Sequence, residues 1–144
     1  MPMFERVLVV CDGNICRSPT VEAMLKREKP GLKVSSAGLL GLEGHDMEPT
    51  ARKVAQQHGL QCELHTARKL TGELCRDNDL ILVMESHQKD RLSQRYPEAS
   101  GKVFLLTQWN GKHDIPDPYR RGHEAFERIY PMMEVATRAW AEKL

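Results

Sequence analysis

The sequence has no long hydrophobic run, almost no net charge and few cysteines. No stretch approaches the roughly 20 apolar residues of a membrane-spanning helix, and we expect no secretory signal before the first strand. A formal net charge of +1 argues against a general binder of nucleic acid or membrane surfaces. Four cysteines in 144 residues fit a reducing cytoplasm better than a disulfide framework. Without repeats, low-complexity segments or linkers, residues 1–144 are expected to form one domain.

The most informative segment is a short apolar run that ends in a cysteine. The β-branched residues of 7–10 predict a buried strand, and Cys11 follows them directly. Gly13 and Asn14 tolerate unusual backbone angles, which suits a tight loop. The sequence therefore predicts a strand that leads into a loop at Cys11.

A helix is predicted directly after this loop. Ser18 is a good N-cap residue, and Pro19 fits the first turn, where its missing N–H costs nothing. A loop that closes at a helix N-terminus presents free N–H groups to an anion, and Arg17 adds a planar guanidinium that binds two phosphate oxygens. The same surroundings favour the nucleophilic thiolate of Cys11. We therefore expect the loop of a phosphatase. The alternative is that Cys11 is a buried small hydrophobe at the end of a core strand.

Strands and helices alternate along the rest of the chain. Short apolar runs predict strands over 7–10, 32–35, 80–84 and 103–106, and helical patterns predict helices over 19–28, 49–58 and 86–95 with a helical turn over 70–75. Ser86 is expected to cap the third helix. This alternation predicts an α/β fold, an open, doubly wound, four-stranded parallel sheet flanked by helices. Ligands of such sheets bind beyond the carboxyl ends of the strands, where Cys11 falls.

The last helix is predicted from an apolar stripe that should lie on the sheet. Pro131 lies inside this stripe and is expected to kink or split the helix. The stripe consists of Phe126, Tyr130, Met133, Thr137, Trp140 and Leu144.

The segment at 10–20, VCDGNICRSPT, resembles the phosphate-binding loop of the low-molecular-weight protein tyrosine phosphatases. Four more segments recur in that family's order: SSAG at 35–38, HTAR at 65–68, DLILVM at 79–84 and IPDPY at 115–119. The resemblance covers nearly the whole chain and is strongest to the bacterial branch associated with capsular and exopolysaccharide synthesis. It implies hydrolysis of phosphotyrosine through a phosphocysteine intermediate, with neither cofactor nor metal.

The resemblance also implies which residues carry the chemistry. Cys11 is the nucleophile, Arg17 binds the phosphate, and Asp117 protonates the leaving group and later activates water. Taken alone, the Asp-Pro pair at 117–118 is typical of a plain turn. The loop residues implied to surround the phosphate are Asp12, Gly13, Asn14, Ile15, Cys16, Arg17 and Ser18.

Supporting roles follow from the same resemblance. The Ser18 hydroxyl is implied to hydrogen-bond the nucleophilic sulfur, although N-capping alone would also explain it. Asn14, Ser36 and His65 are implied to form a buried polar network that holds the loop. Cys16 is implied to form a reversible disulfide that protects the nucleophile, with plain packing as the alternative.

Substrate choice is expected to come from the walls of the site. Tyr119 and Leu40 are the candidates for opposite walls of a deep slot that admits phosphotyrosine. Arg120 and Arg121 could attract acidic residues near the phosphosite or simply form a solvated face. The implied partner is a tyrosine autokinase with a tyrosine-rich tail that controls polysaccharide export. We expect a monomer that binds no nucleic acid and does not insert into membranes.

One residue of the loop departs from the family's pattern. Asp12 occupies a position that is usually apolar or threonine. A carboxylate beside the nucleophile repels an incoming phosphate unless water screens it. We therefore expect the Asp12 side chain to point away from the phosphate, toward solvent or a basic partner.

Other functions remain open from the residues alone. A thioredoxin-coupled arsenate reductase needs two further cysteines close together, whereas Cys62 and Cys75 are thirteen positions apart. A silent phosphate-binding module would not need Asp117, and a thiol oxidoreductase usually spaces its cysteines by two residues, unlike Cys11 and Cys16. The six histidines are scattered without the paired spacing of a metal site.

Overall fold

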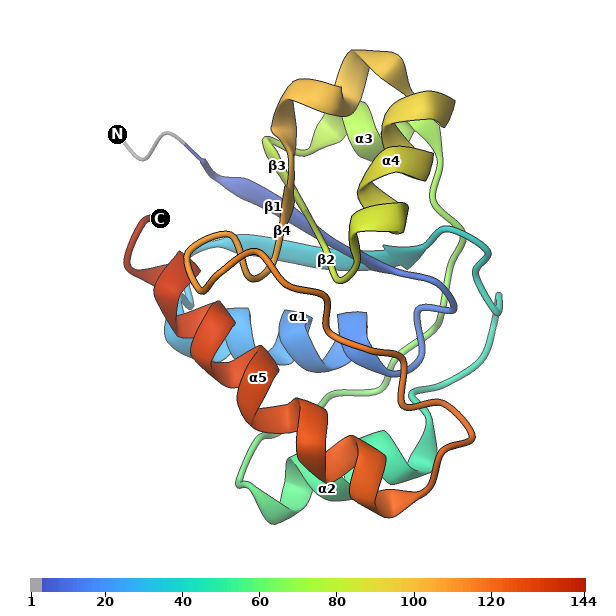
Figure 1. Ribbon diagram of the computed structural model, residues 1–144, viewed down its shortest axis with the longest axis vertical. Helices are drawn as coiled ribbons and strands as arrows, with labels where there is room; N and C mark the ends of the chain where they lie inside the picture. Colours follow the sequence, from blue (N-terminus) through green and yellow to red (C-terminus); the bar gives the residue numbers. More distant parts are fainter. Residues whose placement is uncertain (1–3) are drawn as a thin grey trace.

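The computed structural model describes residues 4–144 and contains an open sheet of four parallel strands in the order β2-β1-β3-β4 (Figure 1). This confirms the predicted fold. The strands are β1 (Arg6–Cys11), β2 (Lys33–Gly38), β3 (Leu80–Val83) and β4 (Val103–Leu105). The α-helices are α1 (Arg17–Glu28), α2 (Pro49–Gln57), α3 (Gly72–Asp77), α4 (Ser86–Arg95) and α5 (His123–Ala141), and a 3-10 helix spans Pro97–Lys102.

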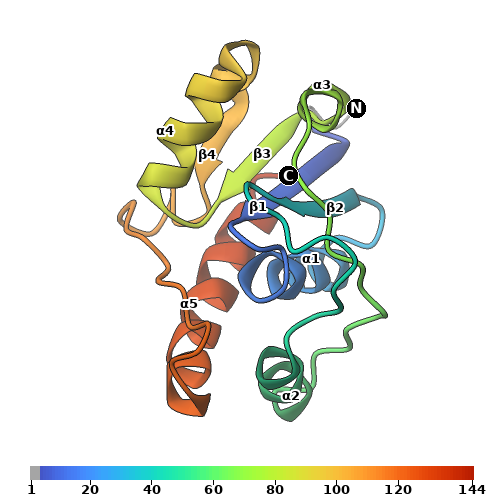
Figure 2. The same cartoon turned by 90° about the vertical axis from the view of Figure 1, so that its right-hand side faces the viewer.

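The two faces of the sheet pack into separate cores. Helices α1, α2 and α5 lie on one side of the strands, and α3 and α4 lie on the other (Figure 2). Side chains of β1 alternate between these cores, since Val7 and Val9 join the first and Leu8 and Val10 the second. Each fully buried Val or Leu stabilises the fold by roughly 1.5–3 kcal/mol. The alternation turns Cys11, the last residue of β1, toward α1.

Both predicted serine caps are wrong. Helix α1 begins at Arg17 with Cys16 as its N-cap residue, so Ser18 lies inside the first turn. Helix α4 does begin at Ser86, but its N-cap residue is Glu85, whose backbone N–H donates to Gln88 Oε1 at 2.9 Å. The Gln88 side chain, three positions after the cap, thereby satisfies the backbone N–H of the cap residue, as in a capping box.

For the last helix, the structure excludes one of the two outcomes predicted at Pro131, and it contradicts the predicted packing of the apolar stripe. Pro131 does not split α5, which continues from His123 to Ala141. Proline removes one helical hydrogen bond, and burial of the flanking Tyr130 and Met133 offsets that loss. The predicted stripe packs mainly on α1 and α2 rather than on the sheet, and it meets the sheet near Trp140, whose Nε1 donates to the Leu105 carbonyl at 3.3 Å. Within residues 4–144, no helix has the length and apolar composition needed to cross a membrane.

Candidate active site

The loop after β1 surrounds a small cavity at the carboxyl edge of the sheet. Cys11 ends β1, residues 12–16 form the loop, and Arg17 begins α1. The cavity has a volume of about 40 Å³. Its lining residues are Cys11, Gly13, Ile15, Cys16, Arg17, Leu42, Asp117 and Tyr119. The structure therefore brings together the cysteine, arginine and aspartate that the sequence singled out.

Asn14 holds the loop in its unusual conformation. Its φ of 61° lies in the left-handed region, and its side chain is fully buried. The amide group donates to Ser18 Oγ at 2.8 Å and to Ser36 Oγ at 2.9 Å, and its oxygen accepts from the Arg68 backbone N–H at 3.0 Å. His65 Nε2 donates to the Asn14 carbonyl at 2.6 Å. These contacts offset the strain of a left-handed asparagine and fix the loop before any ligand binds.

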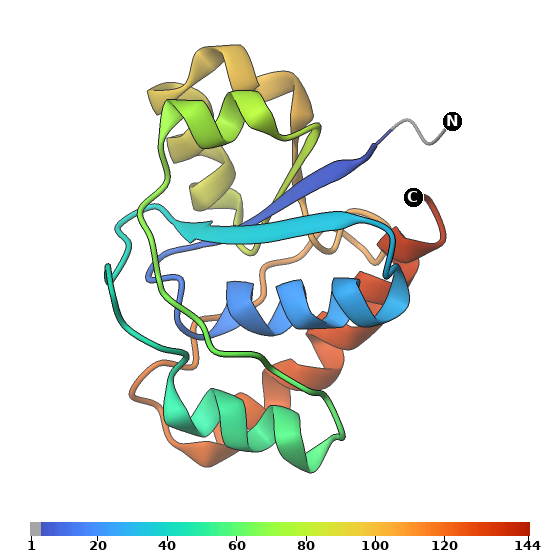
Figure 3. The same cartoon turned by 180° about the vertical axis from the view of Figure 1, so that it is seen from behind.

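Two of these partners, His65 and Arg68, lie on the chain between α2 and α3, which runs past the loop (Figure 3).

A second segment, the chain that follows β2, is hydrogen-bonded to the loop from the other side. Backbone N–H groups of residues 39–42 donate to carbonyls of residues 11–13 at 2.9 to 3.0 Å. At Gly38 a Cβ atom would lie 2.5 Å from the Asp12 carbonyl oxygen, so only glycine allows this approach. The loop is thereby held on both sides.

Arg17 is the most buried charged residue of the site, with 1% of its surface exposed. Its NH1 donates to the Glu85 carboxylate and, at 2.8 Å, to the Ile115 carbonyl. Its NH2 lies 3.6 Å from Asp12 Oδ2 and 3.8 Å from Asp117 Oδ2. Burial works to lower the pKa of Arg17, but the negative groups around it, with Cys11 the strongest, raise it overall. The guanidinium therefore stays charged inside the protein.

One donor of Arg17 has no partner among the described residues. The Nε–H group is buried and donates to no acceptor of the described residues. A buried donor without a partner is costly, and guanidinium groups pair best with planar or tetrahedral oxyanions. The arrangement therefore suits an anion beside Cys11.

Ser18 lies within hydrogen-bonding distance of the sulfur. The distance between Cys11 Sγ and Ser18 Oγ is 3.0 Å. Because Asn14 Nδ2 already donates to Ser18 Oγ, the serine hydrogen is free to point at the sulfur. Cys16 is also buried in this cavity, and burial followed by the charge of Cys11 raises the pKa of its thiol. Cys11 and Cys16 are not joined by a disulfide in the described structure.

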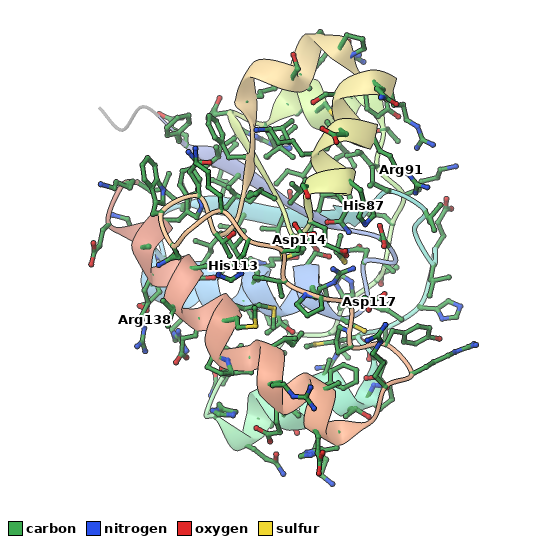
Figure 4. The ribbon with its side chains drawn as sticks, viewed as in Figure 1. His87, Arg91, His113, Asp114, Asp117 and Arg138 are labelled. Atoms are coloured by element: carbon green, nitrogen blue, oxygen red, sulfur yellow. The ribbon has the colours of Figure 1, made fainter. Side chains whose placement is uncertain are left out.

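Asp117 approaches the cavity from the loop between β4 and α5 (Figure 4). Its Oδ1 accepts from the Tyr119 backbone N–H at 3.0 Å, and its side chain is 45% exposed. Leu42 lines the cavity with Tyr119, whereas Leu40, the predicted wall residue, is 62% exposed and does not line it. A contact between Leu40 and a substrate ring outside the cavity stays a prediction. The loop that follows β2 turns at Gly41 with φ of 65°, which brings the second leucine to the cavity.

Asp12 turns toward α4 rather than into the cavity. Its Oδ1 accepts from Gln88 Nε2 at 3.0 Å, and its Oδ2 faces Arg17. The basic partner expected for Asp12 is therefore Arg17, which is also the residue expected to bind the phosphate. Asp12, Glu85 and His87 bring ligand atoms within 4.8 Å of one another, but the adjacent guanidinium opposes a cation there.

Sequence reasoning missed Glu85, Gln88 and Leu42. The first two follow β3, and residues after parallel strands converge at the carboxyl edge of a sheet. The place of Glu85 directly after a predicted parallel strand could therefore have indicated that it lies at the site. No comparable signal distinguished Leu42 from Leu40.

Comparisons with known proteins agree with this geometry. Residues 6–144 match the family model described as low molecular weight phosphotyrosine protein phosphatase. The chain is 49% identical over 142 residues to the low molecular weight protein-tyrosine-phosphatase Wzb of Escherichia coli (strain K12). The aligned region covers 99% of this chain and 97% of that protein. The structure of Vibrio vulnificus Wzb in complex with benzylphosphonate is 45% identical, with a TM-score of 0.95 and coverage of 98% and 99%. The YwlE arginine phosphatase from Geobacillus stearothermophilus is 34% identical, with a TM-score of 0.90 and coverage of 96% and 92%.

Proposed function

Since the chain belongs to the family of low molecular weight phosphotyrosine protein phosphatases, we propose that it hydrolyses phosphotyrosine through a phosphocysteine on Cys11. The chain is a protein-tyrosine-phosphatase. What we propose is which residues perform its steps and which walls of the cavity select an aromatic phosphate. The observation that carries it is the unpartnered, buried Nε of Arg17 in the cavity that Cys11 lines. A phosphoryl oxygen is the partner that this donor lacks.

In the first step, the Cys11 thiolate attacks phosphorus and the bond to the tyrosyl oxygen breaks. Arg17 and the backbone N–H groups of the loop stabilise the charge on the transferring phosphoryl oxygens. Asp117 in its protonated form donates a proton to the departing phenolate. Its 45% exposure leaves it open to solvent protons, and its place on the cavity wall puts it beside the leaving group.

In the second step, water attacks phosphorus and the sulfur–phosphorus bond breaks. Asp117, now a carboxylate, takes a proton from that water. The Ser18 hydroxyl, 3.0 Å from the sulfur, stabilises the thiolate as it departs. Free phosphate and the starting form of the enzyme result.

The walls favour a phosphate on an aromatic ring. Leu42 and Tyr119 flank the entrance, and both are more than a third exposed, so a ring can pack between them. Arg120 lies over the Tyr119 ring with its guanidinium carbon 5.2 Å from the centroid. That contact fixes one cation at the entrance, where acidic residues near a phosphotyrosine would meet it.

The protein partner that we propose is a tyrosine autokinase with a tyrosine-rich tail that acts in polysaccharide export. Support comes from the family branch that the sequence resembles. We further propose a monomeric, cytoplasmic enzyme. Four cysteines in 144 residues fit a reducing compartment better than a disulfide framework, which supports the proposed location. Cys62 and Cys75 pack on opposite faces of the sheet, which disfavours the arsenate reductase alternative.

Turnover of three phosphopeptides tests the proposal. Peptides carrying phosphotyrosine, phosphoserine and phosphoarginine should be compared at equal enzyme concentration, with Arg17→Ala as the inactive control. We expect hydrolysis of the phosphotyrosine peptide at least about 100-fold faster than of the others, since only its ring reaches between the walls. A preference for phosphoarginine, or binding without turnover of any peptide, would overturn it.

A further inference from the structure

The loop that carries Asp117 is anchored just before the aspartate. The Ile115 N–H donates to the Met84 carbonyl at 2.9 Å, and the Ile115 carbonyl accepts from Arg17 at 2.8 Å. Beyond it, the described hydrogen bonds of residues 116–121 are internal to the loop, such as Tyr119 N–H to Asp117 Oδ1. A side chain that strengthens this anchor therefore helps to hold Asp117 in place.

Asp114 provides such a side chain. Its Oδ1 accepts from the Ser86 backbone N–H at 2.9 Å and from Ser86 Oγ at 3.2 Å. Ser86 is the first residue of α4, so its N–H has no partner inside the helix. The positive end of the helix also favours a carboxylate at this position. Figure 4 shows Asp114 beside the start of α4 and Asp117 farther along the same loop.

The residue that precedes Ser86 connects this contact to the phosphate site. Glu85 is the N-cap residue of α4 and also binds the Arg17 guanidinium. Asp114 therefore ties the Asp117 loop to the same helix end that holds Arg17. Because the Asp117 loop and the Arg17 guanidinium are both bonded to the first turn of α4, this helix end sets their relative position.

We propose that Asp114 is a positioning residue that clamps the Asp117 loop onto the first turn of α4. The proposal rests on the proposed role of Asp117 as the general acid. Loss of the clamp lets the acid drift from the leaving group, whereas phosphate binding by the loop after β1 is unaffected. Asp114 is exposed on its outer side and the two Ile115 hydrogen bonds persist, so the effect is partial.

The leaving-group dependence of kcat/KM tests this positioning role. Phenyl phosphate needs a proton on its leaving group more than p-nitrophenyl phosphate does. For Asp114→Ala we expect kcat/KM to fall about fivefold with phenyl phosphate and less than about twofold with p-nitrophenyl phosphate, since only the acid is misplaced. Inhibition by inorganic phosphate should not change. Asp114→Asn keeps an acceptor oxygen and should restore most of the activity.

Ser86→Pro tests the same contact from the other side. It removes both donors to Asp114, and proline is well tolerated at the first position of a helix. It should reproduce the effect of Asp114→Ala even where that variant is unstable. Asp90→Ala, which removes an exposed carboxylate from α4, is the matched control and should leave both substrates unchanged.

The outcomes separate this proposal from the mechanism on which it rests. Asp117→Asn should steepen the leaving-group dependence more than Asp114→Ala does. If Asp117→Asn leaves the dependence unchanged, the general acid is wrongly assigned. If Asp117→Asn steepens it while folded Asp114→Ala and Ser86→Pro do not, the clamp is refuted and the acid stands.

Discussion

Removing the charge of Asp12 should strengthen phosphate binding, and Asp12→Asn is the cleanest way to do so. Asparagine keeps an oxygen that can accept from Gln88 Nε2, as Asp12 Oδ1 does at 3.0 Å. The change therefore leaves the position of the side chain intact and removes one negative charge. That charge lies 3.6 Å from the Arg17 nitrogen that we expect to bind the phosphate.

The size of the effect follows from the distance and the solvent. In water, two unit charges about 6 Å apart interact by about 0.7 kcal/mol, and a phosphate dianion doubles this to about 1.4 kcal/mol. Physiological salt, with a Debye length of about 8 Å, roughly halves the repulsion to about 0.7 kcal/mol. The Asp12 side chain is 27% exposed and does not line the cavity, so we take the water-screened value as the expected one. We therefore expect about a threefold gain in phosphate affinity.

Competitive inhibition by inorganic phosphate measures this gain directly. The inhibition constant should be compared between the native chain and Asp12→Asn at low and high salt, with Asp90→Asn as the control for an exposed carboxylate. The gain should shrink as salt rises. A gain above about 100-fold would show that the carboxylate faces the anion in a low dielectric. Weaker binding in the variant would show that Asp12 holds Arg17 in place, and either result refutes the reasoning.

Three further predictions concern other residues of the site and its surroundings. Arg17→Lys should lower kcat/KM for p-nitrophenyl phosphate by about 100-fold or more, because an ammonium cannot replace a bidentate guanidinium; near-native steady-state kinetics would contradict this. Cys16→Ser should make inactivation by hydrogen peroxide irreversible to added dithiothreitol, whereas the native enzyme recovers, and equal recovery would remove the protective role. Burial raises the pKa of the Cys16 thiol above the ordinary 9.0, so as the pH rises this thiol ionises in the unfolded chain before it does in the folded one. The free energy of unfolding should therefore fall above about pH 9, by up to about 1.4 kcal/mol per pH unit for this thiol. Urea unfolding of the native chain and Cys16→Ser checks that slope, which should be shallower in the variant.

The sheet and the loop after β1 could be predicted because local sequence dictates them. The β-branched run before Cys11 has few alternatives to a buried strand, and Asn14 is suited to the left-handed backbone that it adopts. The positions of Cys11 and Arg17 follow from the strand end and the helix start. These features depend on neighbours in sequence, which a single chain displays.

The contacts that complete the site depend on residues distant in sequence. Glu85 meets Arg17 across 68 positions and Gln88 meets Asp12 across 76, so no local pattern indicates either pair. The serine caps failed for a related reason. Ser18 had its hydroxyl taken by Cys11 and Asn14, which no propensity scale takes into account.

Loop geometry decides which leucine lines the cavity, and the sequence does not show that geometry. The turn at Gly41 brings Leu42 to the cavity and leaves Leu40 outside, although both are leucines of one glycine-rich loop. A sequence can indicate an apolar wall without showing which residue forms it.

Detection of the phosphocysteine tests the central claim most directly. The enzyme should be quenched in acid during steady-state turnover of p-nitrophenyl phosphate, digested, and analysed by mass spectrometry for the peptide that contains Cys11. We predict one phosphoryl group on Cys11 in the turning-over enzyme, and neither phosphorylation nor turnover in Cys11→Ser, because a serine hydroxyl is not ionised in this loop. Phosphorylation of another residue, or sustained turnover in Cys11→Ser, would contradict the account.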